Sequence, residues 1–394
     1  MKNGWQTKTL GEMCEVLNGG TPKTGVPEYW GGKHLWITPA EMGKRLSPYA
    51  NDTERKITDL GLRDSSAQIL PPNSVILSSR APIGHLVINT KPMATNQGCK
   101  GLVPGSQLQH KFLYYYLSSI VDLLNSLGTG ATFKELSGGK LKEVPVPVTS
   151  LPEQQRIVGL LDEAFAGIAT AQATAEKNLQ NARALFASHL QSVFTQRGKG
   201  WEEKPMGEVC EVKDGTHDSP KYVDDGIPFV TQKNIREDGL SFEKTRFIRQ
   251  EDHDDFYRRS NATHGDILIS MIGANRGMAC IVDDERTFSI KNVGLVKKNP
   301  SINHQFLLYF LKSPQAASYV QAASKGGAQE FVGLTELRKF PVPLPSLERQ
   351  NALAETFQSL REETQRLAAH YERKLELLAA LKKSLLNEAF TGKL

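Results

Sequence analysis

The sequence predicts an α+β protein with an internal duplication, in which two mixed, mainly-β domains are separated by two long antiparallel coiled-coil helices with pseudo-two-fold symmetry. A set of residues recurs after 196 positions, short β-branched runs alternate with turn residues in each copy, and each copy ends in a long stripe with helical spacing. We expect the domains to cover residues 1–150 and 199–345, and the helices to cover 151–198 and 346–394.

The duplication starts with a Trp-x(5)-Gly-Glu module at Trp5, which returns at Trp201. The same shift relates the Pro-Val-Pro segments that begin at Pro145 and Pro341. A period this long is too large for a solenoid, so it indicates a duplicated unit of about half the chain. Two similar units in one chain suit a target with two halves.

The first part of each copy is expected to be mainly β, because short β-branched runs are separated by Gly, Pro and Asn. These runs are residues 35–38, 74–78, 84–88, 228–231, 266–270 and 278–282. One amphipathic helix is predicted to interrupt each copy, at 112–119 and 306–312. Alternate prolines cannot sit in a central strand, so the Pro-Val-Pro segments are expected to be extended connectors that leave the domains.

Each copy then continues into a long predicted helix, and Ser150 is a suitable N-cap for the first. Apolar residues follow in steps of four and three, as in a coiled-coil seam. They are Ile157, Leu161, Ala164, Ile168 and Ala171 in the first copy and Leu353, Phe357, Leu360, Thr364 and Leu367 in the second. Both stripes slip at equivalent positions, near 175–179 and 371–375, so the helices could pair with matched local unwinding.

Antiparallel pairing would bring the end of the second copy beside the start of the first. Forty or so residues of helix extend roughly 60 Å, so the helices are expected to act as a spacer of fixed length. The alternative is an unrelated surface helix in each half.

Composition narrows the class of protein. The chain has 394 residues, 39% of them hydrophobic, which fits two or three folded domains. No apolar run is long enough to span a bilayer and no secretory signal is visible, so we expect a cytoplasmic protein and no membrane partner. The four cysteines form no close pair, which favours free thiols over a metal site.

The charge distribution permits nucleic-acid binding without demonstrating it. Residues 1–150 hold 16 Lys and Arg against 11 Asp and Glu, whereas residues 199–345 hold 20 against 21. A nucleic-acid binder needs a local basic face more than a basic total.

Catalytic motifs are missing from the sequence. It has no phosphate-binding Gly-x-x-x-x-Gly-Lys-Ser/Thr, no Gly-x-Gly-x-x-Gly after a strand, no His-Glu-x-x-His and no Gly-x-Ser-x-Gly. Glu211-Val212-Lys213 could imitate part of a metal-dependent nuclease site, but the first copy has Leu17 in place of the lysine. We therefore predict no catalytic residue, no metal site and no cofactor.

Binding chemistry is better represented, in polar loops that occur at equivalent places in both copies. Small residues let backbone amides approach phosphates, while Thr, His, Lys, Asn, Gln and Arg can reach phosphates or base edges. The candidate DNA-binding residues are Thr21, Lys23, Arg80, Asn96, Gln97, Thr129, Thr132, Lys134, Thr216, His217, Lys221, Lys233, Asn234, Arg276, Lys291, Asn292, Lys325 and Gln329. The alternative for each loop is a polar turn that satisfies its own amides.

Arg80 is the best candidate for reading a base, because the stiff Ala81-Pro82 segment that follows could hold its guanidinium in one direction. Lys23 and Lys134 lie in glycine-containing loops and are predicted to contact phosphates. The copies agree at scaffold positions but differ at 40–68 and 233–262. Two copies of one frame with different surfaces would read two different half-sequences.

Taken together, these features resemble the specificity subunit of type I restriction-modification systems, over the whole chain. The resemblance rests on the Trp-x(5)-Gly-Glu module, the Asn96-Gln97-Gly98 turn, the Pro-Val-Pro segments, the Leu151-Pro152-Glu153-Gln154-Gln155-Arg156-Ile157 helix start and the duplicated order. The second copy departs from it with Leu347-Glu348-Arg349-Gln350.

The resemblance implies two target recognition domains, each reading one half of a split, asymmetric sequence in double-stranded DNA. It also implies paired helices that set the gap and dock two modification subunits, which carry S-adenosylmethionine. A separate restriction and translocation subunit would use ATP, so this chain would not itself be an enzyme. The alternatives are an adaptor that bridges two protein partners through its helices and, more remotely, a nuclease.

Overall fold

The computed structural model describes residues 4–130, 134–273, 275–324 and 331–394. The chain divides into two compact units, one formed by Met1–Ala175 with Lys374–Leu394 and the other by Glu176–Arg373. Two long helices, α7 (Leu151–Thr195) and α13 (Leu347–Phe390), each contribute to both units. The division into segments 1–150, 151–198, 199–345 and 346–394, which we expect from the sequence, stays a prediction.

The first unit contains a mixed domain followed by the first part of α7. In chain order its elements are β1 (Gln6–Thr9), α1 (Leu10–Met13), β2 (Cys14–Asn18), η1 (Pro27–Tyr29), β3 (Trp30–Ile37), α2 (Pro39–Met42), β4 (Tyr49–Ala50), β5 (Arg55–Ile57), α3 (Asp59–Arg63), β6 (Val75–Ser78), β7 (Leu86–Asn89), β8 (Met93–Thr95), β9 (Cys99–Pro104), α4 (His110–Ser119), α5 (Val121–Leu127), α6 (Gly138–Lys142) and β10 (Pro145–Val148). Its described strands form sheets of order β2-β9-β6-β7-β4, β5-β3-β8 and β1-β10.

The second unit repeats this plan with fewer strands. Its elements are β11 (Glu202–Pro205), α8 (Met206–Val209), β12 (Val212–Asp214), β13 (Ile227–Val230), η2 (Gln232–Asn234), β14 (Arg246–Ile248), α9 (Gln250–Ser260), β15 (Ile267–Ser270), β16 (Ala279–Ile281), β17 (Ser289–Ile290), β18 (Val293–Val296), α10 (His304–Leu311), α11 (Pro314–Ala323), α12 (Leu334–Lys339) and β19 (Pro341–Leu344). Its described strands form sheets of order β12-β18-β15-β16, β14-β13-β17 and β11-β19.

The small three-stranded sheet has the same construction in both domains. Its middle strand, β3 or β13, pairs antiparallel with β5 or β14 and parallel with β8 or β17. Trp36 faces Arg55 across the antiparallel pair of the first domain, and Phe229 faces Arg246 in the second. The register therefore matches at these paired positions, although β3 is longer than β13 and has an additional, bulged pairing at Trp30.

The Pro-Val-Pro segments are extended and lie outside the larger sheets, as predicted, but they are paired strands and not only connectors. β10 pairs with β1 and β19 pairs with β11 in two-stranded ribbons. Proline is accepted there because a ribbon leaves one edge of each strand without a partner, and the missing N–H faces that edge. The prediction of one helix per copy is wrong, since α5 and α11 directly follow the expected helices.

The long helices form the predicted seam within each unit. Ile157 and Leu161 of α7 are buried with Leu386 and Ala389 of α13 in the core of the first unit. In the second unit Leu190 and Phe194 of α7 are buried with Leu353 and Phe357 of α13. Thr364, also predicted for the seam, is buried, whereas Leu367 is 36% exposed, so the predicted place of Leu367 on the seam is wrong.

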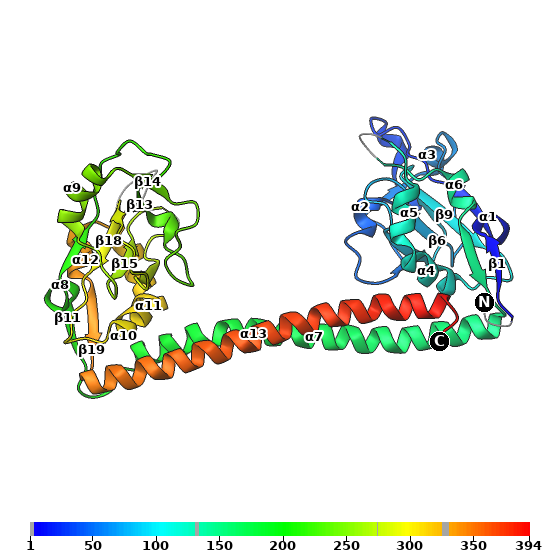
Figure 1. Cartoon of the computed structure of the whole chain (residues 1–394). Coiled ribbons are helices and arrows are strands. Elements are labelled where there is room, and N and C mark those ends of the chain that lie inside the picture. Colours follow the sequence, from blue (N-terminus) through cyan, green and yellow to red (C-terminus); the bar gives the residue numbers. More distant parts are fainter. Residues whose placement is uncertain (1–3, 131–133, 274, 325–330) are drawn as a thin grey trace. The chain divides into compact units, whose positions relative to one another are not determined.

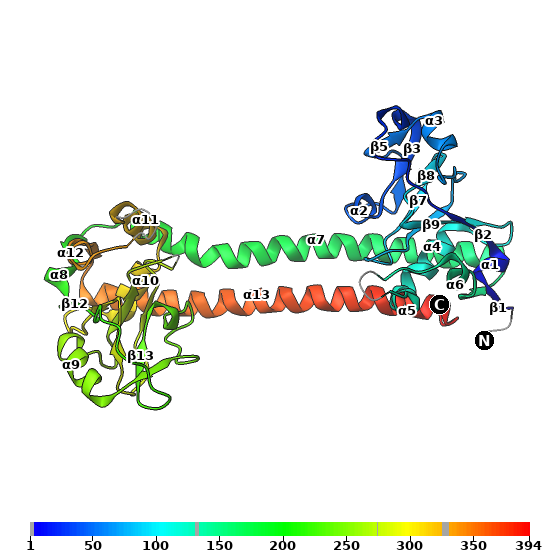
Figure 2. The ribbon, with the colours of Figure 1, turned by 90° about the horizontal axis from the view of Figure 1, so that it is seen from above.

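The end of each long helix packs on a mixed domain, as expected for antiparallel pairing. In the first unit the Phe390 ring lies 5.0 Å from Phe112 of α4, measured between ring centroids. In the second unit Phe194 lies 5.6 Å from Phe306 of α10. The end of the second copy therefore lies beside the first domain, and α4 and α10 mediate equivalent contacts (Figures 1 and 2).

A buried glutamine fastens the start of each long helix. Gln154 Oε1 accepts a hydrogen bond of 2.9 Å from the backbone N of Gln109, just before α4. Gln350 Oε1 accepts one of 3.0 Å from the backbone N of Asn303, just before α10. Both side chains are buried, and each also donates to a backbone carbonyl. This contact explains the glutamine of the Leu-Pro-Glu-Gln motif and its counterpart in the second copy.

Candidate nucleic-acid interface

In the first domain, the predicted loop at Thr21 contacts the predicted turn at Asn96, which follows strand β8 of the small three-stranded sheet. Strand β8 ends at Thr95 and leads into Asn96 and Gln97. Asn96 Nδ2 donates a 2.8 Å hydrogen bond to Thr21 Oγ1, and the Thr21 hydroxyl also bonds to Gln97 Oε1. Asn96 Oδ1 accepts from the backbone N of Gly98 at 2.8 Å and so closes its own turn. The predicted residues Thr21, Asn96 and Gln97 thus form one cluster.

Two further predicted loops adjoin this cluster. The backbone N of Ser79 donates to the Gly98 carbonyl at 2.7 Å, which places Arg80 beside the turn. Arg80 Nε lies 2.9 Å from Glu135 Oε2 in a half-exposed ion pair. Glu135 also exchanges two backbone hydrogen bonds with Thr129, at 3.0 and 2.9 Å. Arg80 and Thr129 therefore belong to the same surface as Asn96.

Positive charge surrounds these loops. Lys23 and Lys134 are exposed, and neither pairs with a carboxylate in the described part of the chain. Lys100, in β9, is nearly buried; burial lowers the pKa of its ammonium, while nearby Glu135 opposes that shift. The predicted Thr132 lies outside the described residues.

The second domain repeats the arrangement with different side chains. Strand β17 leads directly into Lys291 and Asn292. His217 Nδ1 lies 2.7 Å from Asn292 Oδ1, and Lys291 Nζ donates to Ser219 Oγ. His217 Nε2 also lies 3.3 Å from the buried Asp214 carboxylate. The loop that contacts Asn292 is equivalent to the loop that contacts Asn96, as predicted.

A cavity of about 550 Å³ opens at this cluster. Its charged lining residues are Lys233, Arg236, Lys244, Arg246, Lys291 and Glu243. Glu243 is already paired with Arg236 at 3.0 Å. Lys244 has φ of 55°, in the left-handed region that a lysine rarely adopts. The cavity therefore has a strong positive excess in a domain whose total charge is near zero.

Arg236, Lys244 and Arg246 were not among the predicted residues. The sequence does contain a pattern that could have indicated them, because five Lys and Arg residues fall within residues 233–249. The near-zero total charge of the domain does not show this local excess, because most of the Asp and Glu residues of the domain lie outside residues 233–249.

Two predicted residues are buried, and we assign them to holding the loops rather than to contacting DNA. Asn234 Nδ2 donates to the Ser241 carbonyl at 2.9 Å and to Thr245 Oγ1 at 2.8 Å, which uses both of its donors. Thr216 is 3% exposed, and its Oγ1 accepts from the backbone N of Asp218 at 3.0 Å. The sequence alone does not distinguish such satisfied polar groups from exposed ones.

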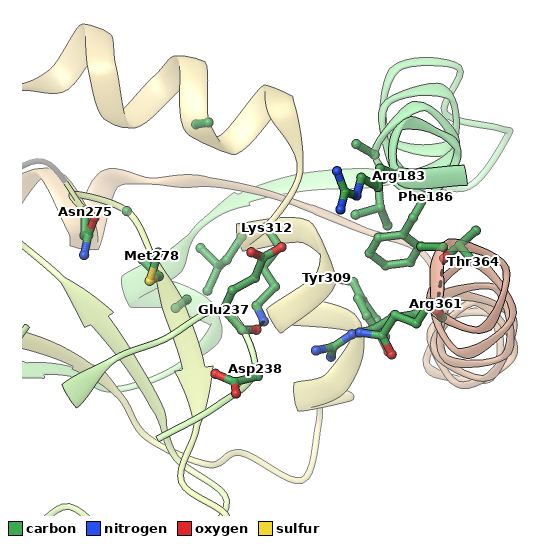
Figure 3. A pocket seen from close by; sticks show the side chains of 18 of the residues that line it. Arg183, Phe186, Glu237, Asp238, Asn275, Met278, Tyr309, Lys312, Arg361 and Thr364 are labelled. Atoms are coloured by element: carbon green, nitrogen blue, oxygen red, sulfur yellow. Dashed lines mark hydrogen bonds between the residues drawn. The ribbon is translucent and has the colours of Figure 1, made fainter. Parts of the chain in front are cut away.

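Arg276 lies apart from the Asn292 cluster. Its Nε donates to Ser324 Oγ at 2.8 Å, and its side chain lines a second cavity of about 910 Å³. Figure 3 shows this cavity, with Arg183 from α7, Arg361 from α13 and Lys312, which directly follows α10, around it. Lys221 is exposed on the loop that follows His217. Lys325 and Gln329 lie outside the described residues.

The described residues also bear on the expectations for metals, cysteines and membrane helices. Among the described residues, no group of three His, Cys, Asp or Glu side chains could hold a metal ion. The four cysteines are free and buried, and burial raises the pKa of the Cys14 thiol to about 12 and that of Cys210 to about 11. No described helix is both long and apolar enough to cross a membrane.

Two domains that present equivalent polar loops from equivalent small sheets, joined to long paired helices, define a protein with an internal duplication. The family model described as "Type I restriction modification DNA specificity domain" matches residues 2–180 and again 198–377. These matches cover most of the chain, and the chain belongs to this family.

Individual relatives agree with the family match. The MjaIX specificity subunit of Methanocaldococcus jannaschii is 31% identical over 268 residues, which is 62% of this chain and 61% of the relative. The EcoR124I/EcoR124II specificity subunit of Escherichia coli is 32% identical over 163 residues, which is 40% of each. The matched region thus spans less than two thirds of these relatives.

A solved structure supports the fold. A chain from the structural study of "complex assembly and conformational transition of the type I R-M system" has a TM-score of 0.78 to this chain at 18% identity. The match covers 100% of this chain and 99% of that chain.

Proposed function

We propose that this chain is the DNA sequence-recognition subunit of a type I restriction-modification complex and reads a bipartite, asymmetric target. The observation that carries the proposal is the duplicated loop cluster, at Asn96 in the first domain and at Asn292 in the second. The family match, which falls once on each copy, supports the same function.

Each domain reads one half-site. The two clusters share a backbone frame but present different side chains, with Thr21 and Gln97 in one and His217 and Lys291 in the other. Different donors and acceptors on the same frame suit different base sequences. The long helices set the spacing between the half-sites.

The long helices also dock two modification subunits, and a restriction and translocation subunit joins through the complex. The 910 Å³ cavity of the second unit is lined by Arg183, Phe186, Ala187 and Leu190 of α7. A cavity of about 660 Å³ in the first unit is lined by Ala379, Lys382, Lys383 and Leu386 of α13, which are the same positions after the shift of 196. Equivalent cavities support equivalent partners, one for each copy.

This docking predicts a difference between neighbouring helix positions. We expect Ala187→Trp and Ala379→Trp each to displace one modification subunit, because they fill the two cavities. Ala184→Trp and Ala380→Trp are matched controls, since these exposed alanines are equivalent to each other and line neither cavity. The mass of the purified complex reports the number of subunits.

The chain supplies recognition and no catalysis, needs no cofactor of its own and works in the cytoplasm. Methyl transfer and DNA cleavage belong to its partner subunits. The buried thiols support a reducing compartment.

Gel-shift measurements and methylome sequencing test the function. The chain assembled with its modification subunits should bind genomic fragments that share one split motif, and cells that express the system should methylate that motif. An adaptor without DNA contacts would assemble with partners but retain no fragment. Cleavage by the isolated chain with metal would favour a nuclease.

A further inference from the structure

Each domain holds an arginine over an aromatic ring beside its candidate loops. In the first domain Arg55 Cζ lies 3.7 Å from the centroid of the Trp30 ring and 5.3 Å from that of Trp36. In the second domain Arg246 Cζ lies 4.5 Å from the centroid of the Tyr222 ring. Both arginines are exposed, and neither was among the predicted residues.

The two arrangements are equivalent in construction. Arg55 begins β5 and faces Trp36 of β3, while Arg246 begins β14 and faces Phe229 of β13. The supporting rings also contact each other, with centroids 5.1 Å apart for Trp30 and Trp36 and 6.2 Å apart for Tyr222 and Phe229. An arginine over an aromatic ring is thus present in both copies, although the segments 40–68 and 233–262 that contain these arginines otherwise differ in sequence.

The aromatic rings tie the first arginine to the candidate loop. Trp30 Nε1 donates to the Lys23 carbonyl at 3.3 Å, and Trp36 Nε1 donates to the Gly20 carbonyl at 2.9 Å. Both ends of the loop that carries Thr21 and Lys23 therefore rest on the same two rings that hold Arg55.

The second arginine lines the basic cavity directly. Arg246 shares the 550 Å³ cavity with Lys233, Lys291 and Asn292. Within the described residues neither Arg55 nor Arg246 pairs with a carboxylate, whereas Arg80 does. Cations that outnumber the nearby carboxylates create a positive potential that attracts a polyanion.

We propose that Arg55 and Arg246 contact the DNA phosphate backbone, one in each half-site; this inference rests on the proposed function. Stacking on a ring holds the planar guanidinium in one orientation and leaves its N–H edge available for a bidentate phosphate contact. Domains that read different sequences share the sugar–phosphate backbone as a common target. A contact present in both domains therefore suits the backbone better than a particular base.

Salt-dependent DNA binding by the full complex tests the proposal. The variants are Arg55→Gln, Arg246→Gln and their combination, measured on a duplex with the methylated motif and on one without it. Each single variant should lower the affinity for both duplexes by a similar factor, roughly tenfold, and lower the slope of log K against log salt by about 1. The double variant should lower the slope by about 2.

Arg286→Gln is a matched control in the second domain. Arg286 also lies over a ring, 4.0 Å from the Phe242 centroid, but Asp284 neutralises its charge. It should leave the slope unchanged. Arg246→Lys keeps the charge and should keep most of the slope, which separates loss of charge from loss of folding.

Several outcomes would overturn the inference. If both glutamine variants had the wild-type slope of log K against log salt, the arginines would only pack on their aromatic rings and would not contact phosphates. A loss confined to the motif-bearing duplex would make them base readers. A wild-type complex that binds neither duplex would instead contradict the proposed function itself.

Discussion

At the scale of single residues, we propose that Arg80 reads a base in the first half-site, and the structure gives its side chain a defined partner. Glu135 holds its Nε at 2.9 Å. A guanidinium has five N–H donors, so this pairing leaves donors that can reach a base edge. Glu135 therefore orients the side chain.

Arg80→Ala should weaken binding to the cognate duplex by about 1–3 kcal/mol and relax selectivity at one base pair. The measurement is the affinity for the cognate duplex and for its single-base variants. If Arg80 were only a surface ion-pair residue, its loss would cost under about 1 kcal/mol of stability, and discrimination would equal that of the wild type.

Lys23→Ala should weaken binding about equally at all sequences and lower the salt slope by about 1, because one phosphate contact is lost. Lys33→Ala is a suitable control, since the exposed Lys33 ammonium is already paired with Asp59 at 2.9 Å. Titration of binding against salt concentration measures both. A slope that falls equally in both variants would contradict a specific role for Lys23.

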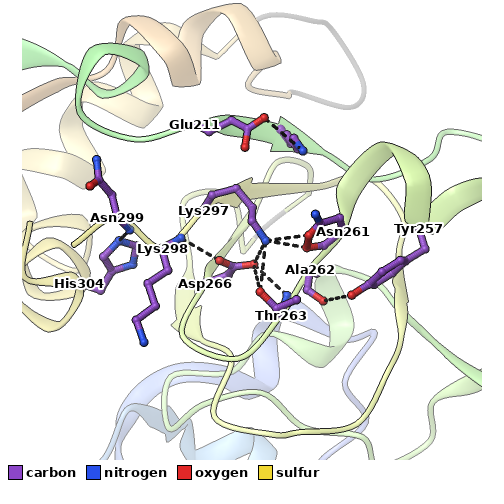
Figure 4. Close-up of polar contacts among 11 residues, drawn as sticks. Glu211, Tyr257, Asn261, Ala262, Thr263, Asp266, Lys297, Lys298, Asn299 and His304 are labelled. Atoms are coloured by element: carbon purple, nitrogen blue, oxygen red, sulfur yellow. Dashed lines mark hydrogen bonds and ion pairs between the residues drawn. The ribbon is translucent and has the colours of Figure 1, made fainter. Parts of the chain in front are cut away.

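Asp266 shows how the second domain supports its strands. Its side chain is fully buried just before β15 and pairs with Lys297 Nζ (Figure 4). It also accepts hydrogen bonds of 2.8 Å from the backbone N atoms of Thr263 and Lys298. These contacts join the start of β15 to the segment that follows β18.

Asp266→Ala should lower the free energy of unfolding by about 3–5 kcal/mol, because it leaves the Lys297 ammonium largely buried without its partner. Glu211→Ala removes the exposed carboxylate 3.2 Å from Lys213 and should cost under about 1 kcal/mol. Chemical denaturation of the two variants compares them. Equal losses would show that the buried pair has no special role.

At the scale of elements, the long helices are the elements that the sequence predicts in most detail. A stripe in steps of three and four predicts a buried seam, and Ile157, Leu161, Leu353 and Phe357 are buried as predicted. The stripe misplaced Leu367, because burial near the middle of a helix depends on the side chain opposite. The Pro-Val-Pro segments show the same limit, since the pattern excludes a central strand but does not reveal a partner such as β1.

Insertion of one heptad into each long helix should lengthen the spacer by about 10 Å, or about three base pairs. Seven residues keep the seam facing the partner helix. Methylome sequencing of cells that express the variant should show the same half-sites farther apart. A four-residue insertion rotates the seam and should impair assembly. If an active heptad variant methylated a motif with unchanged spacing, the helices would not set the distance between the half-sites.

At the scale of the whole molecule, the duplication fits the proposal that one chain reads an asymmetric sequence. The two domains repeat their sheet construction, their loop clusters and their arginine–aromatic pairs. They differ in the side chains that the loops present. Under the proposed function, we therefore expect recognition in one half to change without changing the other.

Replacement of residues 199–345 by the equivalent segment of a relative should change one half of the methylated motif and leave the other half and the spacing intact. The buried Gln350 and Phe194 contacts indicate where the new segment must match the helices. Replacement of residues 1–150 is the reciprocal control. A change in both halves would contradict independent reading.

The sequence by itself determined the duplication, the long helices, the equivalence of the loops and the family resemblance. These features depend on spacing and periodicity, which are visible along the chain without knowing which segments meet in the fold. Thr21, Asn96 and Gln97 were predicted as separate polar positions, but their hydrogen bonding in one cluster depends on how β8 and β2 lie in their sheets.

Only the tertiary structure decided which polar residues face outward. Asn234 and Thr216 are buried because neighbouring backbone groups satisfy their side chains. Arg55 and Arg246 are equivalent although they stand 191 residues apart and not 196, because insertions between the strands shift the numbering. Strand register places them over their rings, and register arises from pairing between segments distant in sequence.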